Sequence, residues 1–140
     1  MRFADILDRN TGHDFLGKST GGGALSVWLH HLKDFQYLPY VRNGNYTGKA
    51  VRVGAGLQGY DLFRLMESKN ITLVTADGST VGAYGGYMQG GGYSAISSLY
   101  GLAADQVLSM EVVTADGRFV IADRYTNRDL FWAMRGGGGG

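Results

Sequence analysis

The sequence contains no cysteine, one proline and no long apolar run. Without cysteine the chain has no disulfide, no thiolate metal ligand and no cysteine nucleophile, and we predict no metal site. No stretch approaches the run of about 18 apolar residues that spans a membrane, and Met1 to Asp5 lack the apolar core of a signal peptide. The 13 basic and 12 acidic residues give a net charge of +1, so we expect neither a nucleic-acid nor a membrane partner.

Glycine, in contrast, is abundant, with 24 of the 140 residues, more than twice its usual share of about 7%. Glycine and the single proline together make up 25 of the 140 residues. This share is below the roughly 25–30% found in disordered low-complexity chains. The hydrophobic share of 44% and the aromatic share of 12% favour a packed structure instead. At this length we expect one domain.

Residue patterns predict short strands and helices separated by glycine-rich loops, which indicates an α/β or α+β fold. Asp116-Gly117 readily adopts the positive φ angles of a type I′ turn and therefore predicts a hairpin. Asn127 is expected to cap the last helix, with Gly136 just after its end. The predicted strands are 49–53, 71–74, 107–114 and 119–122, the predicted helices are 60–69 and 127–135, and the glycine-rich loops are 11–23, 54–59 and 82–92.

Residues 12–19, GHDFLGKS, match the phosphate-loop pattern G-x-x-x-x-G-K-[ST]. In a phosphate loop Lys18 would reach the β and γ phosphates and Ser19 would hold magnesium. That motif must open a helix, but three glycines at 21–23 follow at once. Three glycines cost a helix about 3 kcal/mol relative to alanine, so we do not predict an NTPase.

Residues 54–59, GAGLQG, match the dinucleotide fingerprint G-x-G-x-x-G. A predicted strand precedes them, a predicted helix follows, and Asp77 comes about 20 residues later. One interpretation is a Rossmann-type nicotinamide dehydrogenase that binds pyrophosphate at Gly54, Gly56 and Gly59. The other is a glycine-tolerant turn in a different fold. The fingerprint leaves both open.

A denser glycine cluster, VGAYGGYMQGGGYS, occupies residues 81–94. Glycine lets the main chain approach a ligand closely, and successive N–H groups form an anion-binding concavity without a helix. Together with TGHD at 11–14, this cluster predicts a site that holds a pyrophosphate and a flat ring by main-chain contacts. The alternative is mobile turns in which Tyr84, Tyr87 and Tyr93 are ordinary aromatics. The final run, Gly136 to Gly140, is either a flexible tail or a phosphate-approaching loop.

Four long segments make the sequence resemble fungal FAD-linked oxidoreductases of the berberine-bridge-enzyme-like group, in the vanillyl-alcohol-oxidase superfamily. The resemblance covers nearly the whole chain in one order. It implies an α+β fold, a PCMH-type FAD-binding domain over 1–140 with mixed sheets and flanking helices. We expect that domain to be truncated at both ends, without its first strand and without a substrate domain. The segments are TGHDFLGKSTGGGALSVWLHHLKD (11–34), AVRVGAGLQGYDL (50–62), TVGAYGGYMQGGGYSAISSLYGLAADQVLSMEVVTADGRFV (80–120) and DLFWAMRGGGGG (129–140).

The resemblance also implies the residues of the site. His13 matches the histidine that is joined covalently to the flavin 8α-methyl carbon in many members, although a plain hydrogen-bonding role is the alternative. Gly78 stands where many relatives have a second attachment residue, a cysteine, so no cysteinyl link is possible. Asp105 is equally well explained as a turn or cap residue. The implied cofactor-binding residues are Asn10, Thr11, Gly12, His13, Asp14, Gly82, Gly85, Gly86, Gly90, Gly91, Gly92, Tyr93, Gly101 and Asp105.

The activity that the resemblance implies is an FAD-dependent oxidation. A hydride passes from a small-molecule substrate to flavin N5, and dioxygen reoxidises the flavin with release of hydrogen peroxide. No residue matches a catalytic acid or base, so we expect the 140 residues alone to be inactive. An inactive truncated copy is therefore the second alternative to the oxidase. Relatives are often secreted, but the sequence indicates no compartment. We expect His30 and His31 on the surface, and Phe131 and Trp132 in the core.

Overall fold

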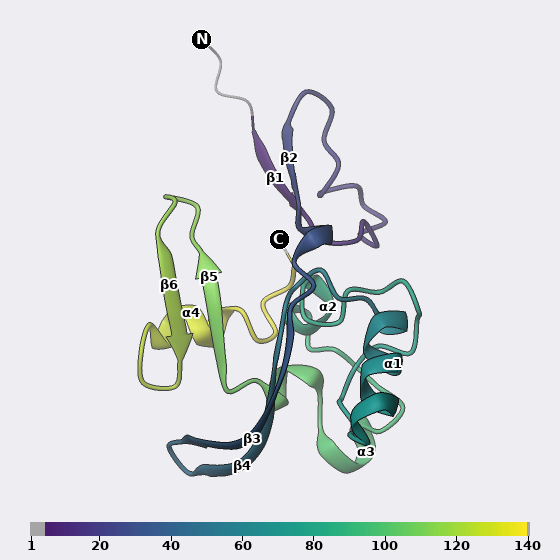
Figure 1. Ribbon diagram of the computed structural model, residues 1–140. Coiled ribbons are helices and arrows are strands. Elements are labelled where there is room, and N and C mark those ends of the chain that lie inside the picture. The colour runs from purple at the N-terminus through teal and green to yellow at the C-terminus, as the bar shows by residue number, and fades with distance from the viewer. Residues whose placement is uncertain (1–4, 140) are drawn as a thin grey trace.

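The computed structural model describes residues 5–139, so Gly140, the last residue of the glycine run, lies outside the described residues. Three two-stranded sheets and four α-helices make up an α+β fold, as expected from the sequence. The β1–β2 pair lies at one end of the molecule and the turn that joins β3 to β4 lies at the other (Figure 1). The elements are β1 (Ile6–Arg9), β2 (Leu25–Trp28), η1 (Leu29–His31), β3 (Phe35–Asn43), β4 (Tyr46–Val53), α1 (Gly59–Lys69), α2 (Gly86–Gln89), α3 (Ser97–Tyr100), η2 (Ala103–Gln106), β5 (Ser109–Val113), β6 (Phe119–Asp123) and α4 (Arg128–Ala133).

The strands pair in three separate ladders. β1 runs parallel to β2, while β3–β4 and β5–β6 are antiparallel hairpins. The register of β3–β4 shifts between Leu38 and Val41, where Pro39 has no N–H group to donate to the ladder. The sequence patterns identified β4 and the β5–β6 hairpin, but they missed β1, β2 and β3.

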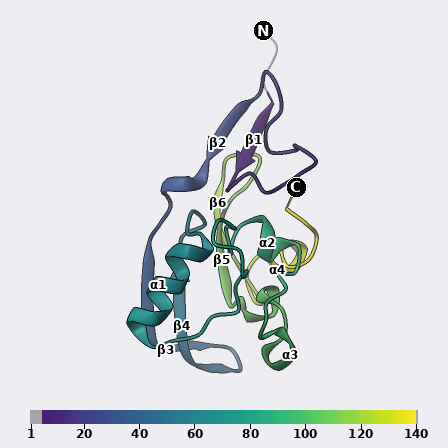
Figure 2. The same cartoon turned by 90° about the vertical axis from the view of Figure 1, so that its right-hand side faces the viewer.

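Two apolar clusters hold the centre of the molecule. Leu62 of α1 is fully buried and packs with Leu57 and Ala83, while Phe35 and Val53 of the β3–β4 hairpin cover them. α1 therefore lies beside this hairpin in both views (Figure 2). The second cluster consists of Val74, Met88 and Ala103. The glycine-rich stretch 82–92 contributes Ala83 to the first cluster and Met88 to the second, so both clusters hold it in place.

The strand predicted over 71–74 is wrong. These residues have no strand partner, because Met66, near the end of α1, takes up the N–H groups of Ile71 and Leu73. The N–H of Ile71 donates to the carbonyl of Met66 (3.0 Å), and that of Leu73 approaches the Met66 sulfur (3.1 Å). Val74 then enters the second cluster.

Two predicted turn details and one core residue also differ. Only Gly117 of the Asp116-Gly117 pair has a positive φ (+81°), so the hairpin turn is not type I′. Asn127 is the N-cap residue of α4, as expected, but its side chain makes no capping hydrogen bond, and its amide donates to the Ile121 carbonyl (2.7 Å). Phe131 is buried as expected, but Trp132 is 76% exposed.

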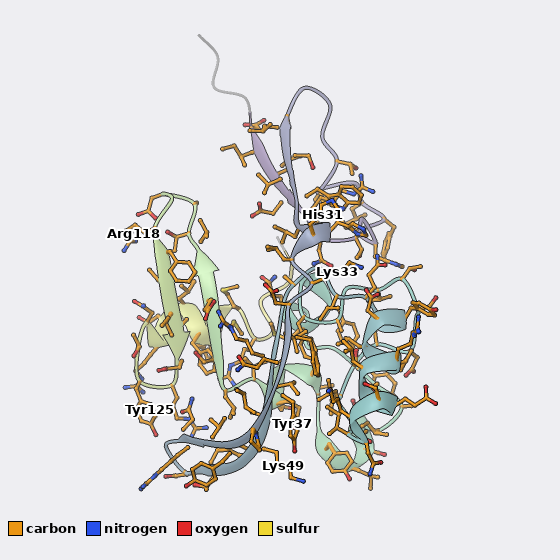
Figure 3. All side chains as sticks on the ribbon, viewed as in Figure 1. His31, Lys33, Tyr37, Lys49, Arg118 and Tyr125 are labelled. Carbon is orange, nitrogen blue, oxygen red and sulfur yellow. The ribbon has the colours of Figure 1, made fainter. Side chains whose placement is uncertain are left out.

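The carboxylate of Asp61 fixes the first turn of α1. It accepts a hydrogen bond from the N–H of Gln58 (3.2 Å), the residue that precedes the helix. Lys33, which is labelled in Figure 3, also pairs with Asp61 at 2.7 Å. Partial burial raises the pKa of Asp61, but the bonds from Lys33 and Gln58 outweigh it and hold that pKa below its usual value.

Replacing Asp61 by alanine removes the capping interaction and the ion pair together. We expect the Asp61→Ala variant to lose about 1 kcal/mol of unfolding free energy at neutral pH, measured by urea unfolding. Because the folded-state pKa of Asp61 is lowered, its contribution is present above the unfolded-state pKa and is lost as the pH falls through the folded-state value. Glu67→Ala, on the same helix, is the matched control. An equal loss in both variants would contradict the capping role.

Candidate functional site

The loop after β1 and the glycine cluster meet, although about 70 residues separate them in the sequence. The Asn10 side chain packs against the main chain of Gly82 and Gly85. The Thr11 methyl group lies 3.1 Å from the position that a Cβ atom would take at Gly82. The two segments predicted to hold the cofactor thus share one face of the molecule.

His13 lies at this junction. It is exposed, and its Nε2 atom lies 3.0 Å from the Thr80 hydroxyl, within hydrogen-bond distance. The sequence did not indicate Thr80 as a site residue, although it directly precedes the glycine cluster at 81–94. The other two histidines lie in η1, where His31 is exposed as predicted and His30 is half-buried, stacked on Trp28 with ring centroids 4.6 Å apart.

Asp14 holds the turn that follows His13. Its carboxylate accepts hydrogen bonds from the N–H groups of Leu16 (3.3 Å) and Lys18 (2.6 Å). These contacts stabilise the turn over residues 14–18, so the Asp14 side chain supports the loop from within. The same turn leads into β2 through further turns and bends, with no helix between Lys18 and β2. This geometry confirms that residues 12–19 are not a phosphate loop.

Free main-chain donors distinguish this junction. Among residues 5–139, the N–H groups of 11–15 and of 86–88 donate to no protein acceptor. Gly12 has a φ of +87°, which turns the chain sharply between Thr11 and His13. Unpaired successive N–H groups around such a turn are suited to an anionic group such as a pyrophosphate. The residues present therefore fit the cofactor expected from the sequence.

The far end of the glycine cluster packs against residues 101–105. The carbonyls of Gly91 and Gly92 accept hydrogen bonds from the N–H groups of Ala104 (3.0 Å) and Ala103 (2.9 Å). Asp105 accepts a hydrogen bond from the N–H of Leu102 (2.8 Å) at the start of η2. Two roles were considered for Asp105, a contact with the cofactor and a cap, and the structure supports the cap. Gly101 lies beside it, because a Cβ atom there would be 2.8 Å from the Asp105 carboxylate.

Two tyrosines anchor the cluster from inside. The Tyr84 hydroxyl donates to the Val74 carbonyl (3.3 Å), and the Tyr87 hydroxyl donates to the Tyr93 carbonyl. Burial, with the neighbouring Tyr87, raises the pKa of Tyr84 to about 12, and burial, with the nearby charge of Asp77, raises the pKa of Tyr87 to about 12. Both hydroxyls therefore remain protonated donors at neutral pH. The Tyr93 side chain is 72% exposed.

The C-terminal glycine run also reaches the site. The N–H groups of Gly136 and Gly138 donate to the carbonyl of Gln89 (2.8 and 3.0 Å). A Cβ atom on Gly86 would lie 3.7 Å from the Cα of Gly139. The described part of this run is thus packed against α2. Of the two interpretations of the run, the tail is therefore wrong. Gln89, which the sequence analysis missed, is its main-chain anchor.

The glycines of GAGLQG have a different role. A Cβ atom on Gly54 would overlap the carbonyl oxygen of Leu32, one on Gly56 would overlap that of Leu29, and one on Gly59 would overlap that of Gly78. Their N–H groups donate to the carbonyls of Asp34, Leu32 and Val81 at 2.7 to 2.9 Å. These glycines accommodate the protein's own main chain and leave no donors for a pyrophosphate. The structure therefore does not favour the Rossmann alternative.

Two surface cavities lie elsewhere. One of about 610 Å³ is lined by α4 and its neighbours, including Arg124, Arg128 and Trp132, and one of about 300 Å³ lies between β4 and residues 70–73. Neither includes a residue of the glycine loops. In residues 5–139, no helix is long and apolar enough to cross a membrane, and no group of acidic or histidine side chains could hold a metal ion.

Comparison with known proteins agrees with this geometry. The family described as "FAD binding domain" matches residues 4–123. The chain belongs to this family. This FAD binding domain is 52% identical over 135 residues to the FAD-linked oxidoreductase ZEB1 of Gibberella zeae, covering 96% of this chain and 24% of that protein. It is 50% identical over 135 residues to the VAO-type flavoprotein oxidase VAO615 of Thermothelomyces thermophilus, with the same shares covered.

Solved structures give the same result. The crystal structure of the VAO-type flavoprotein MtVAO615 from Myceliophthora thermophila superimposes with a TM-score of 0.94 at 50% identity, covering 98% of this chain and 25% of that chain. The 6-hydroxy-D-nicotine oxidase of Arthrobacter nicotinovorans superimposes with a TM-score of 0.80 at 26% identity, covering 95% of this chain and 28% of that one. The FAD binding domain described here thus spans about a quarter of the length of these relatives.

The close packing at GAGLQG gives a test that needs no cofactor. Gly56→Ala places a methyl group on the Leu29 carbonyl and 2.7 Å from that of His30. We expect this overpacking to lower the unfolding free energy by about 1–3 kcal/mol, measured by urea unfolding. Gly22→Ala is the control, since nothing lies within 4 Å of its Cβ position. Equal stability of the two variants would contradict the packing role.

Proposed function

We propose that this chain holds FAD at the junction of residues 11–14 with residues 82–86, as part of an oxygen-dependent FAD-linked oxidoreductase. The observation that supports this location is the contact between the two loops across Asn10, Thr11, Gly82 and Gly85. Membership of the FAD binding domain family supports the identity of the cofactor. We further propose that residues 1–140 make up part of a PCMH-type domain.

The main chain does most of the binding in this proposal. The free N–H groups of 11–15 and 86–88 would donate to the pyrophosphate. Several predicted residues, among them Asp14 and Asp105, would act by shaping the loops, because their carboxylates are already occupied by protein N–H groups. Gly90, Gly91, Gly92, Tyr93 and Gly101 remain proposed members of the site.

His13 is proposed as the covalent attachment residue for the flavin. It is exposed at the junction, and within residues 5–139 one of its ring nitrogens, Nε2, lies within hydrogen-bond distance of a side chain, that of Thr80. A neutral imidazole nitrogen is a competent nucleophile. The sequence contains no cysteine, so a second link through sulfur is excluded.

When bound, FAD would supply the redox chemistry of this proposal, the transfer of a hydride from a substrate and then of electrons to dioxygen, with release of hydrogen peroxide. This chain's residues would orient the cofactor and donate hydrogen bonds to its pyrophosphate. The small-molecule substrate and the catalytic acid or base are expected in the part of the relatives that this chain does not match, about three-quarters of their length. We therefore propose that the 140 residues bind FAD without turning over a substrate.

The attachment through His13 can be tested directly. We expect His13→Ala to abolish acid-stable flavin while weak non-covalent binding remains, because the loop's N–H groups are unchanged. The measurement is the flavin absorbance that stays with acid-precipitated protein after loading with FAD. His31→Ala is the control, since His31 is exposed but lies in η1. Acid-stable flavin in the His13→Ala variant would contradict the assignment.

A methyl group at Gly86 tests whether the main chain touches the ligand. Gly86 is exposed, and an added Cβ atom meets only the Cα of Gly139, at the ordinary contact distance of 3.7 Å. We expect Gly86→Ala to weaken FAD binding by about tenfold, measured by fluorescence titration. The thermal midpoint without FAD should not fall.

Gly91 is a less suitable test position. Its φ of +105° would strain the main chain of any residue with a side chain, whether or not a ligand is bound. Gly22→Ala again serves as the control for Gly86→Ala. Unchanged FAD affinity in Gly86→Ala would mean that this part of the loop faces away from the cofactor.

A further inference from the structure

The side chain of Asn10 connects three segments that are far apart in the sequence. Its Nδ2 group donates a hydrogen bond to the carbonyl of Ala55, in the loop between β4 and α1. A Cβ atom on Gly82 would overlap its Oδ1 atom, and one on Gly85 would lie 2.7 Å from both its Cγ and its Nδ2 atoms. One amide thus fills the space that two missing side chains leave.

We propose that Asn10 is a positioning residue that fixes the loop at 11–14 against the loop at 82–86. Its side chain faces the protein, so it does not act as a ligand of the cofactor. His13 follows Asn10 by three residues, and Gly86 directly follows Gly85, so a shift of this amide would displace both loops. The inference rests on the proposed function, because it concerns the geometry of the same FAD site.

Burial supports a fixed position for this amide. Gly82 and Gly85 are both buried. The Oδ1 atom of Asn10 is buried too, and among residues 5–139 it accepts no hydrogen bond. This end of the amide therefore lies against the glycine main chain, at Gly82 and Gly85. A side chain that packs this closely has little room to move, so it fixes the distance between the two loops.

The size and chemistry of asparagine fit this role. The amide donor satisfies the carbonyl of Ala55, and the flat group fits between two Cα atoms that carry no side chain. Aspartate has the same shape but no N–H group, and it would place a charge against that carbonyl. Alanine would leave a void at the same place.

A double-mutant cycle tests the contact itself. We expect Asn10→Ala and Gly82→Ala each to lower the urea midpoint of the chain. In the double variant, the atom nearest to the new methyl group is the Thr11 methyl, 3.1 Å away, which can rotate. The double variant should therefore have a higher midpoint than Gly82→Ala alone. Additive losses would show that the two residues do not meet and would overturn the proposal.

Cofactor binding tests the positioning role. We expect Asn10→Ala and Asn10→Asp to weaken FAD binding by about ten- to a hundredfold. At saturating FAD, the visible circular dichroism of the bound flavin should also change, whereas a loss of stability alone would reduce only the bound fraction. Asn45→Ala is the matched control, because Asn45 is exposed in the turn between β3 and β4, at the other end of the molecule (Figure 1).

The two readouts separate this inference from the proposed function. Unchanged affinity and dichroism in a folded Asn10→Ala variant would overturn the positioning role while leaving FAD binding intact. If the unsubstituted chain bound no FAD, the proposed function would fail and the positioning role with it. The unfolding cycle would then still decide whether Asn10 and Gly82 are in contact.

Discussion

This structure depends on close contacts at glycine positions, where no side chain keeps the main chain away from a neighbouring segment. At Gly54, Gly56 and Gly59 a carbonyl oxygen of another segment occupies the place of the missing Cβ atom. At Gly82 and Gly85 the amide of Asn10 does so. The apolar clusters around Leu62 and Met88 are small. The relative positions of the loops are therefore set by these close contacts as well as by burial of apolar surface.

The same constraint explains how one kind of residue serves two purposes. Where glycine N–H groups donate to the protein's own carbonyls, as at Gly54 and Gly56, the close contact is structural. Where glycine N–H groups have no acceptor within residues 5–139, as at Gly12 and Gly86, they are available to an anionic ligand. The distinction lies in the partners of the N–H groups and not in the glycine spacing. This is why a dinucleotide fingerprint occurs here without a dinucleotide site.

The sequence predicted local features well and long-range ones poorly. The helix over 60–69 follows from the spacing of Leu62, Leu65 and Met66, and the β5–β6 hairpin follows from a short turn. The strand expected at 71–74 failed because the end of α1 takes up its N–H groups. The pairing of β1 with β2, and the contact of Asn10 with Gly82, join segments that no local pattern relates. The location of the candidate site was predicted from the family resemblance, because members of one family share the contacts between distant segments as well as the local patterns.

Hydrogen–deuterium exchange with and without FAD is the most direct test of the central claim, that the free N–H groups of two loops together hold the cofactor. Adding FAD should slow exchange at residues 11–15 and 86–88. It should leave residues 54–59 unchanged, because the N–H groups of Gly54, Gly56 and Gly59 already donate to protein carbonyls. Protection confined to 54–59, or to only one of the two loops, would contradict the account.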